Sequence, residues 1–82
     1  MIKLDRNDLV LFEDSFGVSH IARVANAKNA IEGKYNIAVF ILKSVEKSDL
    51  NTANISDKEI IMKLDGCKNA DEAEAMYPEI WL

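Results

Sequence analysis

The sequence predicts an α+β fold: a small antiparallel sheet followed by a short C-terminal helix. Short apolar runs separated by turn residues predict the strands, and a helix-start signal near residue 69 predicts the helix. The 82 residues are enough for one domain, spanning 1–82, and too few for two. The hydrophobic content of 49% is typical of a globular chain and excludes a disordered one.

Residues 8–13 predict the first strand, because four consecutive apolar residues lie between charged ends. The sequence Asp14-Ser15-Phe16-Gly17 then predicts a tight turn. Residues 18–33 fit two templates. One is a helix beginning at Ser19 and ending at Gly33, and the other is a strand over 18–25 with a later turn at Glu32-Gly33. We favour the strand, because the turn before it is short enough for a direct hairpin.

Residues 35–42 form the strongest predicted strand. Six apolar residues follow one another from Ile37 to Leu42, and three of them are β-branched, which predicts a central strand covered on both faces. A chain of this size supplies only one substantial covering layer. If 18–33 is a hairpin rather than a helix, we therefore expect a homodimer or a protein partner on the other face.

The second half is more polar. Residues 43–54 predict a loop, and Ser56 with Glu59 matches a helix capping box. The apolar spacing after it predicts a short helix ending at Asp65-Gly66, with a strand over 58–64 as the alternative. Asn69 as N-cap predicts the final helix, which Pro78 ends.

This order of strands, with the Asp-Ser-Phe-Gly turn and the Ser-Asp-Lys-Glu segment, resembles small SH3-like barrels of the Tudor or KOW type over residues 8–64. The resemblance implies a small barrel. The aromatic cage that such ligand-binding modules often carry has no clear counterpart here, so no functional residue is transferred.

Reactive side chains are sparse. The single His20 and the single Cys67 lie 47 positions apart, which is not the spacing of a zinc site. The three glycines are isolated, so no phosphate-binding loop is present. Neighbouring acids occur at Glu13-Asp14, beside a turn, and at Asp71-Glu72-Glu74, in the first part of a helix. Carboxylates in both places are expected to be solvated and ionised, whereas general acid–base catalysis needs one in an apolar pocket. We therefore expect no metal, no cofactor and no enzymatic activity.

The net charge of −4 resides entirely on residues 69–82, because ten acidic and ten basic residues balance over 1–68. This segment combines acids with aromatic rings. Its apolar residues are expected either to pack on the domain's own core, because a small domain needs every apolar residue, or to anchor a partner, because the composition is typical of binding hot spots. The binding residues predicted here are Asp71, Glu72, Glu74, Tyr77, Glu79 and Trp81. We expect a non-enzymatic protein-binding or inhibitor protein, by analogy with small accessory and phage-encoded regulators. It would dock on a basic protein surface through this segment or through an apolar sheet face.

The alternative is a small SH3-like nucleic-acid-binding module that uses Arg23, Lys28 and Lys34. The negative net charge disfavours nucleic acid, and the absence of a polybasic patch disfavours a membrane surface. No signal-peptide pattern opens the chain, and one cysteine cannot form an internal disulfide. We therefore expect a cytoplasmic protein.

Overall fold

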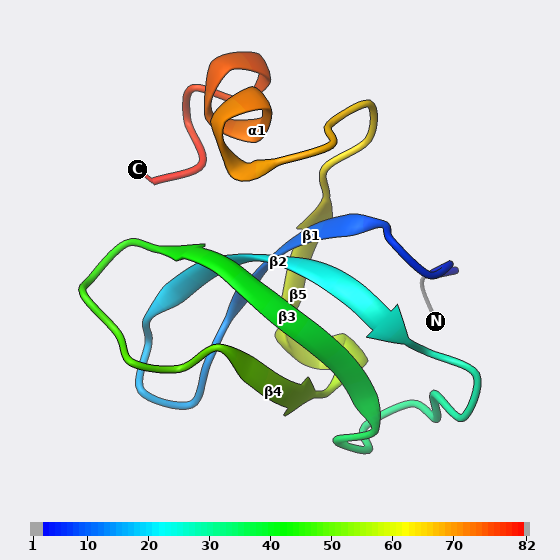
Figure 1. Ribbon diagram of the computed structural model, residues 1–82. Coiled ribbons are helices and arrows are strands. Elements are labelled where there is room, and N and C mark those ends of the chain that lie inside the picture. The colour runs from blue at the N-terminus through cyan, green and yellow to red at the C-terminus, as the bar shows by residue number, and fades with distance from the viewer. Residues whose placement is uncertain (1–2, 82) are drawn as a thin grey trace.

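The computed structural model describes residues 3–81 and contains one five-stranded antiparallel sheet with the strand order β4-β3-β2-β1-β5 (Figure 1). The strands are β1 (Leu9–Glu13), β2 (Ser19–Asn26), β3 (Ile37–Ser44), β4 (Thr52–Ile55) and β5 (Ile60–Lys63). A 3-10 turn, η1 (Asp57–Glu59), precedes β5, and the helix α1 (Ala70–Met76) follows it. The predicted α+β class, antiparallel sheet and C-terminal helix are confirmed.

The hairpin of β1 and β2 forms around the predicted turn. The Asp14 carboxylate accepts hydrogen bonds from the backbone N–H groups of Phe16 (2.9 Å) and Val18 (3.0 Å). Gly17 adopts a φ of 80°, a conformation that costs glycine little. Residues 19–26 continue as β2 and then leave the sheet as an irregular loop over 27–36. The strand that we favoured is confirmed, and the alternative helix between Ser19 and Gly33 is wrong.

The strand β3 is confirmed, but the expectation that it is covered on both faces is wrong. Ile37 and Val39 are buried on one face, whereas Phe40 is 44% exposed and Leu42 is 37% exposed. The helix does not cover β3 completely, because its buried contacts are with β1 and β2. The prediction that a partner or second copy covers this face stays a prediction.

Two expectations for residues 43–64 are wrong. The polar segment 43–54 is not all loop, because β3 extends to Ser44 and β4 begins at Thr52. The capping box of Ser56 and Glu59 is present, but it starts a single 3-10 turn instead of an α-helix. Residues 60–63 then pair with β1, so the alternative strand is correct. Pairing with a neighbouring strand outweighs the local helical spacing.

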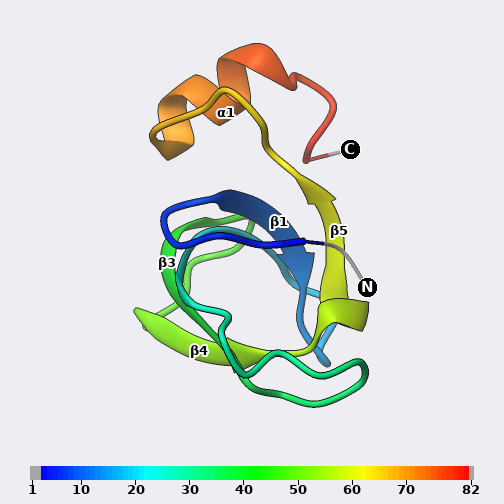
Figure 2. The ribbon, with the colours of Figure 1, turned by 90° about the vertical axis from the view of Figure 1, so that its right-hand side faces the viewer.

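Buried side chains lie on both faces of β1 and β2, so that all four residues from Leu9 to Phe12 are buried. The inner cluster comprises Val10, Phe12, Ala22, Val24, Ile37, Val39 and Ile55. The outer cluster comprises Leu9, Leu11, Ile21, Leu64, Ala73 and Ile80. Figure 2 shows the reason: the sheet is curled, and α1 lies outside the curl, over β1. The outer cluster includes residues of the sheet and of this helix, and the inner cluster lies on the other face of the sheet.

The curled sheet remains open. Its edges are β4 and β5, and no ladder joins these two strands within residues 3–81. Closure into a barrel is therefore not observed. In the same range, no helix is long and apolar enough to cross a membrane.

The covering of the outer face by the C-terminal segment can be tested at Ile80, which is 7% exposed. We expect Ile80→Ala to lower the free energy of unfolding by about 2–4 kcal/mol, because it leaves a cavity in the outer cluster. The control is Ile61→Ala on β5, where the side chain is 53% exposed and the expected loss is below about 1 kcal/mol. Equal losses in urea unfolding of the two variants would contradict this arrangement.

Candidate functional site

The predicted aromatic residues of the C-terminal segment contact their own chain. Tyr77 and Trp81 both pack against the outer cluster. The Tyr77 hydroxyl donates a hydrogen bond to the carbonyl oxygen of Asp65 (3.1 Å), and the Trp81 indole N–H donates to the Glu74 carboxylate (2.7 Å). The structure therefore brings Glu74, Tyr77 and Trp81 together as part of the outer layer.

Two of the predicted acids are also engaged within the chain. The Lys43 ammonium contacts Glu74 at 2.6 Å, which joins α1 to the end of β3. Hydrogen bonds from Lys43 and Trp81 lower the pKa of Glu74 below its usual value. The Glu72 carboxylate accepts a hydrogen bond from the backbone N–H of Lys68 (3.0 Å). Asp71 and Glu79 are exposed.

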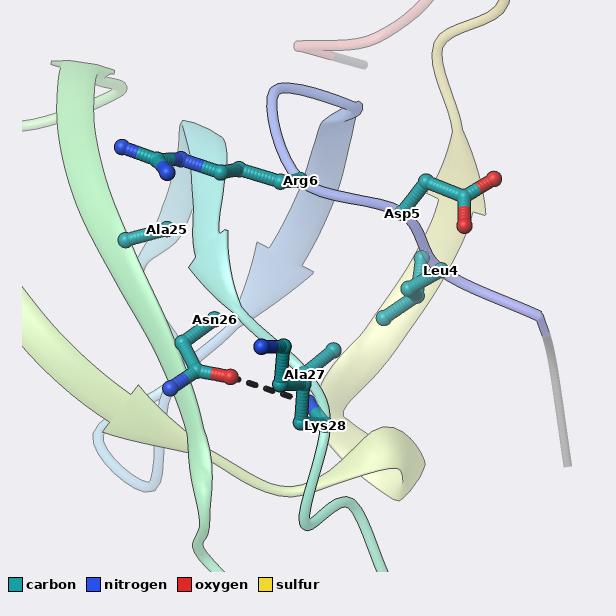
Figure 3. A pocket seen from close by; sticks show the side chains of 7 residues that line it. All are labelled: Leu4, Asp5, Arg6, Ala25, Asn26, Ala27 and Lys28. Carbon is teal, nitrogen blue, oxygen red and sulfur yellow. Dashed lines mark hydrogen bonds between the residues drawn. The ribbon is translucent and has the colours of Figure 1, made fainter.

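The basic residues of the nucleic-acid alternative lie in three different places. Arg23 is on the outer face of β2, with its guanidinium 5.5 Å from the centre of the Phe40 ring. Lys28 lines a pocket of about 320 Å³ beside the N-terminal segment, and Lys34 is exposed in the loop 27–36. Figure 3 shows Arg6 along the same pocket, with the Asp5 carboxylate pointing away from Arg6 and Lys28. The structure does not gather the three residues into one site.

A second pocket, which we call the turn pocket, lies between the β1–β2 turn and strands β3 and β4. Its volume is about 230 Å³. It is lined by Phe12, Asp14, Ser15, Phe16, His20, Tyr35, Ile41, Leu50, Ala53, Asn54, Ile55 and Glu59. The lining therefore contains two carboxylates and no lysine or arginine. Three of its large apolar side chains are exposed: Phe16 by 90%, Tyr35 by 62% and Leu50 by 54%.

A buried histidine forms one wall of the turn pocket. The His20 side chain is 1% exposed, and its ring stacks on Phe12 with 4.9 Å between the centroids. Its Nε2 lies 2.8 Å from Oδ2 of Asp14, and its Nδ1 lies 2.6 Å from Oγ of Ser44. The imidazole therefore links the β1–β2 turn to the last residue of β3. We call these three residues the histidine bridge.

The carboxylate of the histidine bridge is held in its ionised form. Burial raises the pKa of Asp14, but hydrogen bonds from His20 and from the backbone N–H groups of Val18 and Phe16 lower it by more. The net effect is a pKa below the usual value for aspartate. An ionised carboxylate accepts the Nε2–H of the imidazole, and this hydrogen bond determines which ring nitrogen carries the proton.

The histidine bridge has no counterpart among the residues predicted from the sequence. His20 and Cys67 were the candidate reactive residues, but Cys67 packs against the outer cluster, on the opposite side of the sheet from His20. The nearby Asp14 was recognised as a turn residue only. Ser44 lies 24 positions from His20, and only the β2–β3 register, which pairs these two residues, brings them together. No local pattern reports such a contact.

No grouping of three histidine, cysteine, aspartate or glutamate side chains able to hold a metal occurs in the part of the chain that the structure describes. Comparison of the chain with protein-family models, curated proteins and solved structures finds no significant match.

The contribution of Asp14 to stability depends on pH. Its pKa is lower in the folded state than its ordinary value near ~3.9, so the stabilisation is complete above that value and is lost as the pH falls through the lowered pKa. Between about pH 5 and pH 3, we expect the wild-type protein to lose more unfolding free energy than Asp14→Asn. The control, Asp49→Asn, replaces an exposed loop acid and should follow the wild-type curve. Parallel curves for wild type and Asp14→Asn in urea unfolding would contradict the interpretation.

Proposed function

We propose that this chain is a non-enzymatic protein-binding module whose docking site is the turn pocket. The observation that carries the proposal is the combination of exposed apolar side chains with carboxylates in one concave site. Binding sites for other molecules are typically concave and largely apolar, with a few convergent polar groups. The C-terminal segment supports docking less well, because its aromatic residues already contact the outer cluster.

The chemistry of the lining indicates a partner segment with a lysine or arginine next to an apolar residue. Phe16 and Tyr35 offer ring faces to a cation, and their exposure leaves these faces accessible. Asp14 and Glu59 supply negative charge to the same pocket, and the protein carries a net charge of −4. Leu50 and Ile41 offer contact area for the apolar neighbour. Such complementarity favours association with a basic partner and weakens as salt screens it.

We also propose that the sheet is an open variant of an SH3-like barrel. Two features support this: the strand order, in which β5 returns to pair with β1, and the 3-10 turn between β4 and β5. In this proposed fold, the turn pocket lies between the first hairpin turn and the β3–β4 side of the sheet.

The second candidate remains nucleic-acid binding, supported by one observation. Arg23 lies over the Phe40 ring on the part of the outer face that the helix leaves exposed. An arginine with an exposed ring can stack on unpaired bases. The separation of Arg23, Lys28 and Lys34, together with the negative net charge, makes this candidate the weaker one.

The proposal is tested with three fluorescent probes in anisotropy titrations: a short amidated peptide that alternates lysine and phenylalanine, its counterpart with glutamate in place of lysine, and a single-stranded thymidine oligonucleotide. We expect the lysine peptide to bind and the glutamate peptide not to bind. Tyr35→Ala should weaken binding of the lysine peptide at least about tenfold, or ~1.4 kcal/mol, because it removes an exposed ring from the site.

The matched control is Ile31→Ala, which removes a 58% exposed apolar side chain outside the turn pocket and should leave the affinity unchanged. Three results would overturn the proposal: equal binding of the two peptides, no loss in Tyr35→Ala, or binding of the oligonucleotide alone. If only the oligonucleotide binds and Arg23→Ala abolishes that binding, the nucleic-acid candidate would be favoured.

A further inference from the structure

The histidine bridge places a hydroxyl group next to a buried imidazole. The Oγ of Ser44 lies 2.6 Å from Nδ1 of His20, and Nε2 on the other side of the ring lies 2.8 Å from the Asp14 carboxylate. A hydroxyl, an imidazole and a carboxylate connected in this order are the components that activate a serine nucleophile. This arrangement points to a function beyond the docking proposed above, although Asp14 and His20 also line the turn pocket.

The hydrogen bonds determine the direction of proton transfer. The ionised Asp14 carboxylate can only accept a hydrogen bond, so in the uncharged form of the ring the proton is on Nε2 and Nδ1 has a free lone pair. The Ser44 hydroxyl is the only donor within hydrogen-bond distance of this nitrogen among the described side chains. The hydroxyl therefore donates to Nδ1, and the imidazole is positioned to take its proton as a general base.

The surroundings favour such a transfer. The His20 ring is 1% exposed and stacks on Phe12, so it is fixed in place and shielded from water. The Asp14 carboxylate is held by two backbone N–H groups, which in turn fixes the ring. If the imidazole takes a proton, the adjacent carboxylate stabilises the resulting positive charge.

Ser44 is also positioned at a surface that a small molecule can reach. It is half-buried and lines a pocket of about 240 Å³ formed by the end of β3 and the β3–β4 loop. Ile41, Leu42 and Leu50 give this loop pocket apolar contact area, and Lys47 adds a cation. A small acyl ester is of the size and polarity that such a pocket accommodates.

We propose that Ser44 is an activated nucleophile that accepts an acyl group from an electrophilic ester. The Oγ forms a bond to the carbonyl carbon while its proton moves to Nδ1 of His20. The bond from that carbon to the ester oxygen then breaks, and the leaving alcohol takes the proton from the imidazolium. The products are an acylated Ser44 and the free alcohol, with His20 neutral again. His20 acts as the general base, and Asp14 is a positioning residue.

The test uses an alkyl fluorophosphonate, which forms a stable adduct with activated serines when fluoride leaves. The labelled residue is located by mass spectrometry of proteolytic peptides, and labelling rates are measured over a range of pH. We expect one adduct per chain, on Ser44, formed about 100-fold or more faster than on other serines, which is the size of a general-base contribution. Ser44→Ala should abolish rapid labelling.

Ser48, which is exposed in the loop pocket, serves as the reference serine for labelling rates in the wild-type protein. Ser19→Ala is the matched control variant, because Ser19 precedes His20 on β2 but lines neither the loop pocket nor the turn pocket. This variant should be labelled on Ser44 at the wild-type rate. Asp14→Asn should slow labelling at least about tenfold and shift the pH–rate profile to lower pH, a change that loss of folding alone would not produce. Circular dichroism checks that each variant is folded. No adduct on Ser44 in the wild-type protein, or equal rates on Ser44 and Ser48, would overturn the proposal.

Discussion

A buried histidine that must satisfy both ring nitrogens is the constraint on which much of this structure depends. His20 faces the inner side of the sheet at the turn end of the first hairpin, where a buried polar group without a partner would be costly. Asp14 supplies a partner from the turn and Ser44 supplies one from β3. Three segments are thereby held in one geometry, and the turn that presents Phe16 to the turn pocket becomes part of a fixed wall.

The second constraint is the small size of the chain. A domain of 82 residues buries a modest fraction of its surface, so an apolar residue near the C-terminus is as valuable to the fold as one in the sheet. This explains why Ile80 and Trp81 lie against β1 and β2 instead of facing solvent. The acid Glu74 then joins this layer to Lys43 on β3. A sequence rich in acids and aromatic rings therefore serves first to cover the outer face.

Local patterns in the sequence predicted the first hairpin, β3 and α1, because each is defined by neighbouring residues. The capping box of Ser56 was also correct, but its continuation was not, since pairing with β1 decides the structure of residues 60–63. The edge strand β4 was missed because it has only four residues, so its alternation of Thr52 and Asn54 with Ala53 and Ile55 is too short to stand out beside a polar segment. The site was predicted least well: the contact between His20 and Ser44 depends on the β2–β3 register, which composition and spacing do not reveal.

The most direct test of this account is the protonation state of the His20 imidazole, observed by nitrogen-detected NMR at pH values where the ring is neutral. We expect the proton to be on Nε2 and to exchange slowly with water, and Nδ1 to accept a hydrogen bond. We also expect Ser44→Ala to change the Nδ1 resonance while the Nε2 proton stays protected. A proton on Nδ1, or a ring proton in rapid exchange with water, would contradict it.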